Sequence, residues 1–270
     1  MDFATLWVVG VARHVHAVEE GESMEIVKAT VWLYQLAFAR TFQLICKNWA
    51  VLFAPLAYSV ILSLASAVVA PLGFLGGMLL LLVTDACISS GLYLIENMLK
   101  MGKTDVNDFL KGWTVYLLDI IQISFILWIP MTLAAQVLYP LPNGLLILLF
   151  LRILIYTVFN VVPELLYQAR LGGLEVLSAS YSFVIENWIE WFVPNLFIGV
   201  AAYLALGPLA LLATFLPSGF QFFFIVAVAS FFLSYFMVFR GALFSLLRGT
   251  SRRSRIYKYK MGEPFQGNNW

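Results

Sequence analysis

The stretch NWAVLFAPLAYSVILSLASAVV, from Asn48 to Val69, contains no Asp, Glu, Lys or Arg. A run of roughly 20 apolar residues is what a helix needs to cross about 30 Å of hydrocarbon. The whole chain of 270 residues is 62% hydrophobic and only 11% charged, whereas soluble domains average about 45–50% apolar and about 25% charged residues. Because such a chain cannot cover its surface with polar groups, the composition predicts a membrane protein.

Six apolar runs are long enough to cross a bilayer. They cover residues 49–69, 74–98, 113–138, 145–167, 188–215 and 219–247. Three connections between them, at Pro71, at Tyr139–Gly144 and at Leu216–Gly219, contain Pro and Gly but no charged residue, which predicts tight turns. The sequence therefore predicts an all-α fold with six transmembrane helices.

The basic residues gather on the other side of these spans. Of the sixteen Lys and Arg residues, Lys28, Arg40 and Lys47 precede the first span, Lys100, Lys103 and Lys111 separate the second from the third, Arg170 follows the fourth, and Arg248, Arg252, Arg253, Arg255, Lys258 and Lys260 follow the sixth. Cytoplasmic loops carry the excess of basic residues in membrane proteins. We therefore expect a multi-pass protein of the cytoplasmic (inner) membrane with both termini in the cytoplasm.

Two amphipathic helices are expected ahead of the first and fifth spans. In the first, Met24–Lys47, six polar residues fall on one narrow helical face: Glu25, Lys28, Gln35, Arg40, Gln43 and Lys47. In the second, residues 174–186, the polar stripe is Glu175, Ser178, Ser182 and Glu186, and Gly172-Gly173 precedes it as a breaker. Such helices lie in the cytoplasmic headgroup layer or pack under the helix bundle.

The start of this stretch is repeated later in the chain: NWAVLFAP at Asn48–Pro55 is followed 139 residues later by the similar NWIEWFVP at Asn187–Pro194. In this pattern Asn caps the span, Trp marks the boundary between water and lipid, and Pro is tolerated near the helix start. We expect Trp49, Trp188 and Trp191 to be interfacial anchors. Both spans run outward, which predicts a parallel internal repeat; the alternative is independent use of one good solution for entering a membrane.

The repeat divides the chain into three expected regions. Residues 1–23 form an N-terminal cytoplasmic or interfacial segment. Residues 24–248 form one membrane domain, with repeat units at 24–98 and 171–248 around central spans at 113–167. Residues 249–270 form a basic cytoplasmic tail.

The second copy, GGLEVLSASYSFVIENWIEWFVP, resembles the entry helix of bacterial six-helix membrane domains of the glycerophosphodiester-phosphodiesterase membrane-domain type and their uncharacterised relatives. The polar loop KMGKTDVNDFLKGW and the Pro163-Glu164 pair share in this likeness. These relatives usually carry Arg or Lys where this chain has Ser180 and Ser182. The resemblance implies the six-helix layout but no phosphodiesterase activity, because the catalytic domain is absent.

Ionisable residues inside a bilayer are costly and are the first candidates for function. Asp85 lies about 15 Å into the second span and Arg152 about 10 Å into the fourth from the same face, at a rise of 1.5 Å per residue. We expect these two side chains to form an ion pair. With Asp119 they form either a proton or ion path or a structural pair that fixes helix register. Glu96, Glu164 and Arg240 lie near the cytoplasmic ends of spans, and we expect them to snorkel to the boundary.

The tail SRRSRIYKYK, Ser251–Lys260, is a dense basic run with Arg252, Arg253, Arg255, Lys258 and Lys260. It suits anionic lipid headgroups, an acidic partner or nucleic acid, or it is ordinary anchoring at the cytoplasmic face. In a membrane protein we expect lipid headgroups and no nucleic acid.

The other motifs indicate no cofactor and no metal site. MGKTD at Met101–Asp105 lacks the earlier Gly of a phosphate loop, since Asn97 occupies that position; Thr104 or Asp105 is expected to cap a short helix. His14 and His16 diverge on a helix and have no third ligand. Cys46 and Cys87 match no redox motif, although Cys46 at the membrane edge is a palmitoylation candidate.

Two functions fit these patterns. There is no nucleophile–base pair and no carboxylate pair, so we expect no enzyme. The first function is a non-catalytic subunit that scaffolds or stabilises a larger membrane complex, with other subunits or further copies of this chain as partners. The alternative is a transporter for a lipid or small apolar solute that uses an Asp85–Arg152 site.

Overall fold

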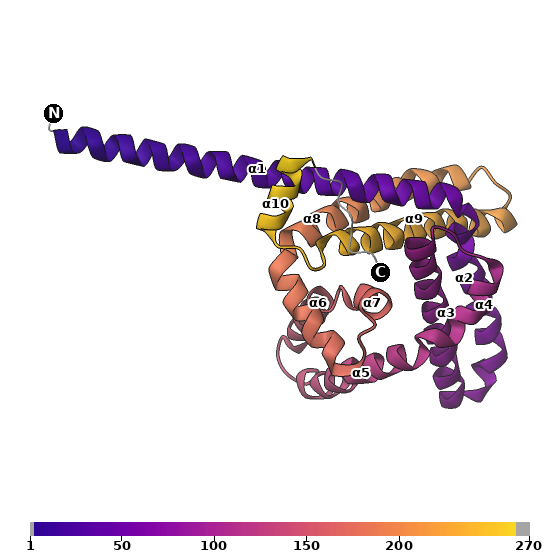
Figure 1. Ribbon diagram of the computed structural model, residues 1–270. Coiled ribbons are helices and arrows are strands. Elements are labelled where there is room, and N and C mark those ends of the chain that lie inside the picture. Colours follow the sequence, from indigo (N-terminus) through magenta and orange to yellow (C-terminus); the bar gives the residue numbers. More distant parts are fainter. Residues whose placement is uncertain (1–2, 263–270) are drawn as a thin grey trace.

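The computed structural model describes residues 3–262, and of residues 3–23 it describes only the backbone. This part of the chain is helical and contains no strand. The helices are α1 (Phe3–Lys47), α2 (Ala54–Val69), α3 (Phe74–Met101), α4 (Val106–Val115), α5 (Leu117–Leu138), α6 (Gly144–Val158), α7 (Val162–Glu164), α8 (Gly173–Ala213), α9 (Ser218–Leu247) and α10 (Arg252–Met261) (Figure 1). Short 3₁₀ turns cover Trp49–Phe53 and Ala70–Leu72, and a π-helical turn covers Leu165–Ala169.

Within the described residues, six helical segments are long and apolar enough to cross a membrane, as expected of a multi-pass membrane protein. They are Trp49–Leu72, Phe74–Met101, Leu117–Leu138, Gly144–Ala169, Gly173–Ala213 and Ser218–Leu247. The predicted all-α fold with six membrane-spanning helices is confirmed at this level of length and composition.

Three predicted boundaries change in the structure. The third span begins at Leu117 instead of residue 113, because the backbone leaves the helix at Tyr116 (φ −113°, ψ 3°). The fourth is interrupted between Val158 and Val162, where α6 ends and α7 begins. The fifth is continuous with the amphipathic helix before it, so that α8 is one long helix with a kink at Asn187.

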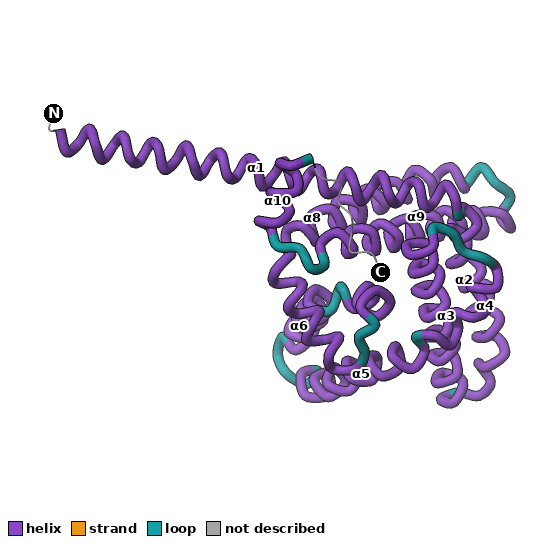
Figure 2. The backbone as a smooth tube through the Cα atoms, in the orientation of Figure 1, coloured by secondary structure: helices purple, strands orange, loops and turns teal. Residues whose placement is uncertain are grey.

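Helix α1 runs alongside α9, and the hairpin of α2 and α3 leaves this layer at a steep angle (Figure 2). On the other side of the molecule, α5 and α6 pack on each other and on α8. The buried face of α1 is a stripe at every fourth residue, formed by Ala29, Leu33, Ala37 and Thr41. Small side chains in this stripe let the two helices approach closely, and the rings of Phe38 and Phe239 lie 4.6 Å apart. Helix α1 thus packs against the other helices, which is one of the two placements that its sequence allowed.

Helix α4 is fixed against α3 at Gly112. A Cβ on this glycine would lie 2.8 Å from the Cα of Ser90. The hydroxyl of Ser89 donates to the Gly112 carbonyl at 2.6 Å. The predicted cap of α4 is also confirmed, since the Asp105 carboxylate accepts from the amide of Val106 at 3.0 Å. The segment KMGKTDVNDFLKGW therefore comprises the end of α3, a loop at residues 102–105 and most of α4, which is docked on α3.

Candidate functional site

The most buried ion pair among residues 24–262 joins Glu164 on α7 to Arg240 on α9, with side-chain exposures of 0% and 8%. Arg240 Nε donates to one carboxylate oxygen at 2.8 Å, and Nη2 donates to the other at 2.9 Å. Nη2 also donates at 2.5 Å to the carbonyl of Asn160, in the break between α6 and α7. The guanidinium lies 5.2 Å from the ring centre of Trp191, whose Nε1 donates to the Asn160 side chain at 3.0 Å. The pair therefore fastens α7, α8 and α9 together.

A second cluster surrounds Glu96 on α3, whose side chain is 2% exposed. Its carboxylate accepts from Lys100 at 2.8 Å, from Arg170 at 2.6 Å and through a short bond from the hydroxyl of Tyr116. Burial and the neighbouring Glu96 raise the pKa of Tyr116, so this hydroxyl keeps its proton and remains a donor. Arg170 has a left-handed backbone (φ 55°) and stacks over the Tyr116 ring at 5.1 Å. This cluster joins α3, the start of α5 and the loop before α8.

A third cluster holds the basic tail in place. Glu190 on α8 accepts from Arg252 at 2.6 and 3.1 Å and from Arg255 at 3.1 Å. Arg255 also donates to the side chain of Asn187 at 3.2 Å. Burial lowers the pKa of Arg255, whereas the bond to Glu190 raises the pKa of Arg252. Helix α10 is therefore docked on the α8 kink by two arginines that share one carboxylate.

These clusters correct several sequence-based predictions. Glu96, Glu164 and Arg240 do not snorkel to the boundary, because each is buried in an ion pair between helices. Trp191 is wrong as an interfacial anchor, since its side chain is fully buried between Phe183 and Phe244. The signal that could have found the third cluster was Glu190 itself, an acid inside an apolar run, together with an arginine-rich tail.

The expected pair between Asp85 and Arg152 does not form within the chain. Neither side chain has a hydrogen-bond or ion-pair partner among residues 24–262. The reason is the helix packing: α3 packs on α2, α4, α5 and α9, whereas α6 packs on α5 and α8. Arg152 is exposed and Asp85 is partly exposed.

Asp119 lies at the start of α5 against the Gly172-Gly173 turn that opens α8. A Cβ on Gly172 would lie 2.9 Å from Oδ1 of Asp119, and one on Gly173 would lie 3.3 Å from Nε2 of Gln122. A carboxylate near a helix N-terminus is stabilised by the free amide groups there. The structure thus places Asp119 at a helix junction and does not bring it together with Asp85 or Arg152.

The two Asn-Trp motifs have the same local structure. Asn48 has φ −125° and ψ 39°, and Asn187 has φ −126° and ψ 23°. Both side chains are buried and donate to the carbonyl four residues earlier, Asn48 at 2.8 Å and Asn187 at 3.3 Å. The predicted capping role is wrong for Asn48, which makes no side-chain cap and instead bonds the carbonyl of Gly102 and the amide of Thr104. The adjacent Trp49 and Trp188 are 66% and 57% exposed.

A mixed polar and apolar pocket of about 680 Å³ lies where α8, α9 and α10 meet. Its polar lining includes Arg248, Arg252 and Arg255 with Ser182, Ser251 and Thr250, and its apolar lining includes Phe183, Phe244 and Leu247. Other residues of the predicted basic tail do not line this pocket. Lys260 pairs with Glu25 at 2.5 Å, and Arg253 is exposed. Arg252 and Arg255 also line a much smaller cavity with Ile26, Leu33 and Ile256.

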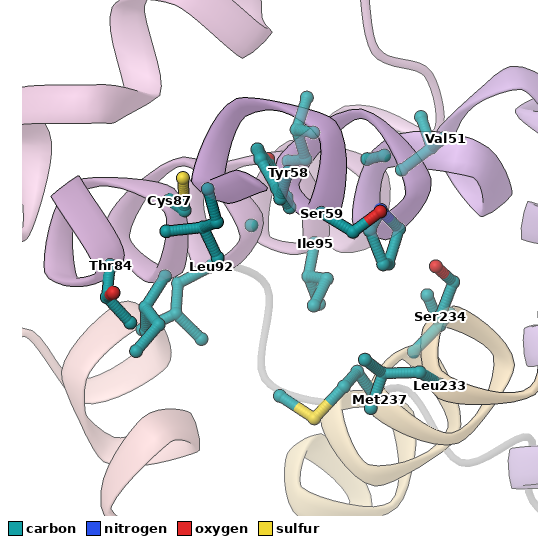
Figure 3. A pocket seen from close by; sticks show the side chains of 17 residues that line it. Val51, Tyr58, Ser59, Thr84, Cys87, Leu92, Ile95, Leu233, Ser234 and Met237 are labelled. Atoms are coloured by element: carbon teal, nitrogen blue, oxygen red, sulfur yellow. The ribbon is translucent and has the colours of Figure 1, made fainter. Parts of the chain in front are cut away.

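A second pocket, of about 350 Å³, is apolar and lies between α2, α3 and α9 (Figure 3). Leu233, Ser234 and Met237 of α9 face Tyr58, Cys87 and Ile95 across it. The hydroxyls in its lining are used within the protein: those of Tyr58, Ser59, Thr84 and Ser234 donate to Ser90 Oγ, Leu56 O, Leu80 O and Leu52 O. With its polar groups occupied, the pocket suits an alkyl chain or another apolar group.

Metal ligands do not gather in the described part of the chain, where no three His, Cys, Asp or Glu side chains could hold an ion together. The side chains of His14 and His16 lie outside the described residues. Compared with models of protein families, with curated proteins and with solved structures, the chain matches none. Its function must therefore be argued from its own residues.

Proposed function

We propose that this chain is a non-catalytic integral subunit that scaffolds or stabilises a larger complex in the cytoplasmic membrane. The observation that carries this proposal is that the three buried carboxylates among residues 24–262, those of Glu96, Glu164 and Glu190, are each bound by at least one arginine. A general acid or base must exchange protons with a substrate. Carboxylates held by arginines between helices suit a rigid framework better than proton transfer.

The outer surface also supports an assembly role. Large apolar side chains are strongly exposed on several helices, among them Phe74 at 83%, Tyr156 at 75% and Phe215 at 85%. Exposed apolar area on membrane helices contacts either lipid or another subunit. In addition, the N-terminal part of α1 extends beyond the rest of the molecule as a helical arm (Figure 1). A helix that extends in this way offers a binding surface to a neighbouring protein at the cytoplasmic face.

The proposed orientation has both termini in the cytoplasm, with α1, α4 and α10 on that side. The distribution of basic residues supports this orientation. A parallel internal repeat is supported by the matched backbone and side-chain geometry of Asn48 and Asn187. The six-helix layout also agrees with the proposed likeness to the membrane domain of glycerophosphodiester phosphodiesterases.

Anionic lipid headgroups are the proposed ligands at the cytoplasmic side. The pocket between α8, α9 and α10 combines arginines and hydroxyls with an apolar wall, which suits the phosphate and glycerol of a lipid. Trp188 is exposed next to Asn187, which lines this pocket. Exposed tryptophans favour the headgroup layer. The exposed Trp188 beside the pocket therefore supports a position of the pocket at the depth of the headgroups.

A second candidate function is transport of a lipid or small apolar solute, and the apolar pocket between α2, α3 and α9 favours it. Filling this pocket tests the idea. Gly91 lines it, whereas Gly77 on the same helix has no other group within 4 Å of an added Cβ. If the pocket binds substrate, Gly91→Leu abolishes flux of a fluorescent lipid into vesicles and Gly77→Leu does not. Equal flux in the two variants would exclude a transport role for this pocket.

The subunit proposal is tested by purification in a mild detergent with identification of co-purifying proteins by mass spectrometry. The expected result is a different protein present in fixed stoichiometry with the chain. The comparison sample is the same preparation after a harsher detergent that strips peripheral contacts. A preparation that contains only this chain and lipid in both detergents would overturn the proposal.

A further inference from the structure

Asp85 and Arg152 are two charged residues in membrane-spanning segments that have no partner within the described chain. Asp85 lies within α3 and Arg152 within α6, in segments apolar enough to cross a membrane. Neither has an ion-pair or hydrogen-bond partner within residues 24–262. By contrast, Glu96, Glu164 and Arg240, which also belong to these apolar segments, are paired. Asp119 at the start of α5, and Glu175 and Glu186 ahead of the kink of α8, also have no ion-pair partner among residues 24–262. Unlike these three, Asp85 and Arg152 lie in the middle of their segments and have opposite signs.

Their positions along the helices match. Asp85 lies eleven residues after Phe74 and Arg152 eight residues after Gly144, which at 1.5 Å per residue is about 16 and about 12 Å from the helix starts. Both helices begin after a turn on the same side of the spans, since they are the second and fourth in order. The long arginine side chain covers the remaining difference in depth.

The surroundings of the two charges are apolar and open. On α6, Phe150 and Ile153 beside Arg152 are 68% and 56% exposed. On α3, Leu81 and Ile88 near Asp85 are 65% and 46% exposed. A charge in such a surface faces hydrocarbon, at a cost of about 2.5–3.5 kcal/mol or more for each residue. Ionisable residues in membrane helices almost always pair for this reason.

We propose that Asp85 of one copy of this chain pairs with Arg152 of a second copy inside the membrane. The two side chains do not pair within one chain, because α3 and α6 both contact α5 but do not pack closely on each other. A pair between two copies removes the cost of exposing each of these charges to hydrocarbon. It needs only this one kind of contact and no other protein. The proposal deepens the proposed subunit role by naming a second copy as one partner and this ion pair as its contact.

The test uses full-length chains with two different tags, co-expressed and purified in nanodiscs. Wild-type copies are expected to co-purify. Asp85→Arg in both copies, or Arg152→Asp in both, places like charges at the contact and reduces co-purification at least tenfold. Mixing one copy with Asp85→Arg and one with Arg152→Asp restores opposite charges and recovers it. Lys103→Glu, which reverses an exposed charge in the loop after α3, is the control and leaves co-purification unchanged.

Crosslinking keeps the test decisive if a charge-reversal variant does not insert. In a chain with Cys46→Ala and Cys87→Ala, one copy carries Asp85→Cys and the other Arg152→Cys. A disulfide between differently tagged copies supports the proposal. Absence of the crosslink, wild-type copies that do not co-purify, or failure of the mixed charge reversal would overturn it. Loss of self-association while another protein still co-purifies contradicts only this inference, whereas a self-associating chain without any other protein contradicts only the larger complex.

Discussion

Arg240 binds both carboxylate oxygens of Glu164, at 2.8 and 2.9 Å, and the glutamate is completely buried. Two charges removed from water lose several kcal/mol of hydration each, and their mutual attraction repays this only when the geometry is good. The bidentate contact and the further bond to Asn160 provide that geometry. The pair therefore stabilises the junction of α7 and α9 mainly because each buried charge has its counterion and its hydrogen bonds.

Removing one partner is expected to cost more than removing both. Glu164→Gln leaves Arg240 as a buried charge without its counterion, and we expect a loss of about 3–5 kcal/mol in the free energy of unfolding. The double variant Glu164→Met with Arg240→Met removes both charges and is expected to recover more than half of this loss. Denaturant unfolding in detergent, followed by circular dichroism, measures both. A double variant as unstable as the single one would mean that packing, and not charge, holds this junction.

The sequence predicted the spans well but not the charges between them. Apolar runs and uncharged Pro-Gly turns are local features, and they located the six membrane-spanning helices because the bilayer requires a minimum helix length. Glu164 and Arg240 are 76 residues apart, so their contact depends on how α7 and α9 meet, which no local pattern encodes. Depth alone predicted an Asp85–Arg152 pair within one chain, and it was insufficient because α3 and α6 both contact α5 but do not pack closely on each other.

The anchoring of α10 by Glu190 predicts a protease-sensitive tail when that anchor is lost. Glu190→Gln removes the charge that holds both Arg252 and Arg255, so α10 should detach more often. Trypsin should then cleave after the α10 arginines about tenfold faster or more, since cleavage follows the open fraction. The measurement is a time course on the protein in nanodiscs, read by mass spectrometry.

The matched control for the tail is Glu25→Gln. It removes the pair between Glu25 and Lys260, whose side chains are 40% and 53% exposed. Surface pairs are worth about 0–1 kcal/mol, so cleavage should remain near the wild-type rate. If both variants are cleaved alike, Glu190 is not the anchor of α10.

The contact between Asp119 and the start of α8 predicts a small loss of stability when Gly172 gains a side chain. Gly172→Ala places a methyl 2.9 Å from the Asp119 carboxylate, which must rotate away, so the loss should lie at the low end of the about 1–3 kcal/mol that overpacking typically costs. The double variant Gly172→Ala with Asp119→Ala removes the clash and should recover stability. Gly199→Ala, in an open part of α8, should be neutral or stabilising. Thermal unfolding of the four proteins in one detergent checks this, and a destabilised Gly199→Ala with an unaffected Gly172→Ala would contradict it.

Tyr34 on α1 predicts a loss of stability in alkaline solution. Burial and the charge of Glu190 raise its pKa from the ordinary value of 10.0 to about 12. The folded protein thus favours the protonated phenol, so this contribution is complete below pH 10 and is lost as the pH rises from about 10 to about 12. Tyr34→Phe cannot ionise. The stability difference between wild type and Tyr34→Phe should therefore be constant below pH 10 and shift toward the variant above it, in a series of melts from pH 7 to 12; a constant difference throughout would show that Tyr34 ionises normally.

Trp49 and Trp188 test the repeat, because each follows an asparagine with the same backbone conformation and both are exposed. If the two motifs enter the membrane in the same way, these positions lie at one depth on the cytoplasmic side. Trp49→Cys and Trp188→Cys, each labelled with a nitroxide in a chain lacking Cys46 and Cys87, should then give depths within about 3 Å, two residues of helix rise. Phe215→Cys follows the other end of α8 and should report the opposite surface. Depths for Trp49 and Trp188 that place them on opposite sides of the membrane would refute both the parallel repeat and the proposed orientation, because each requires the two motifs to face the cytoplasm.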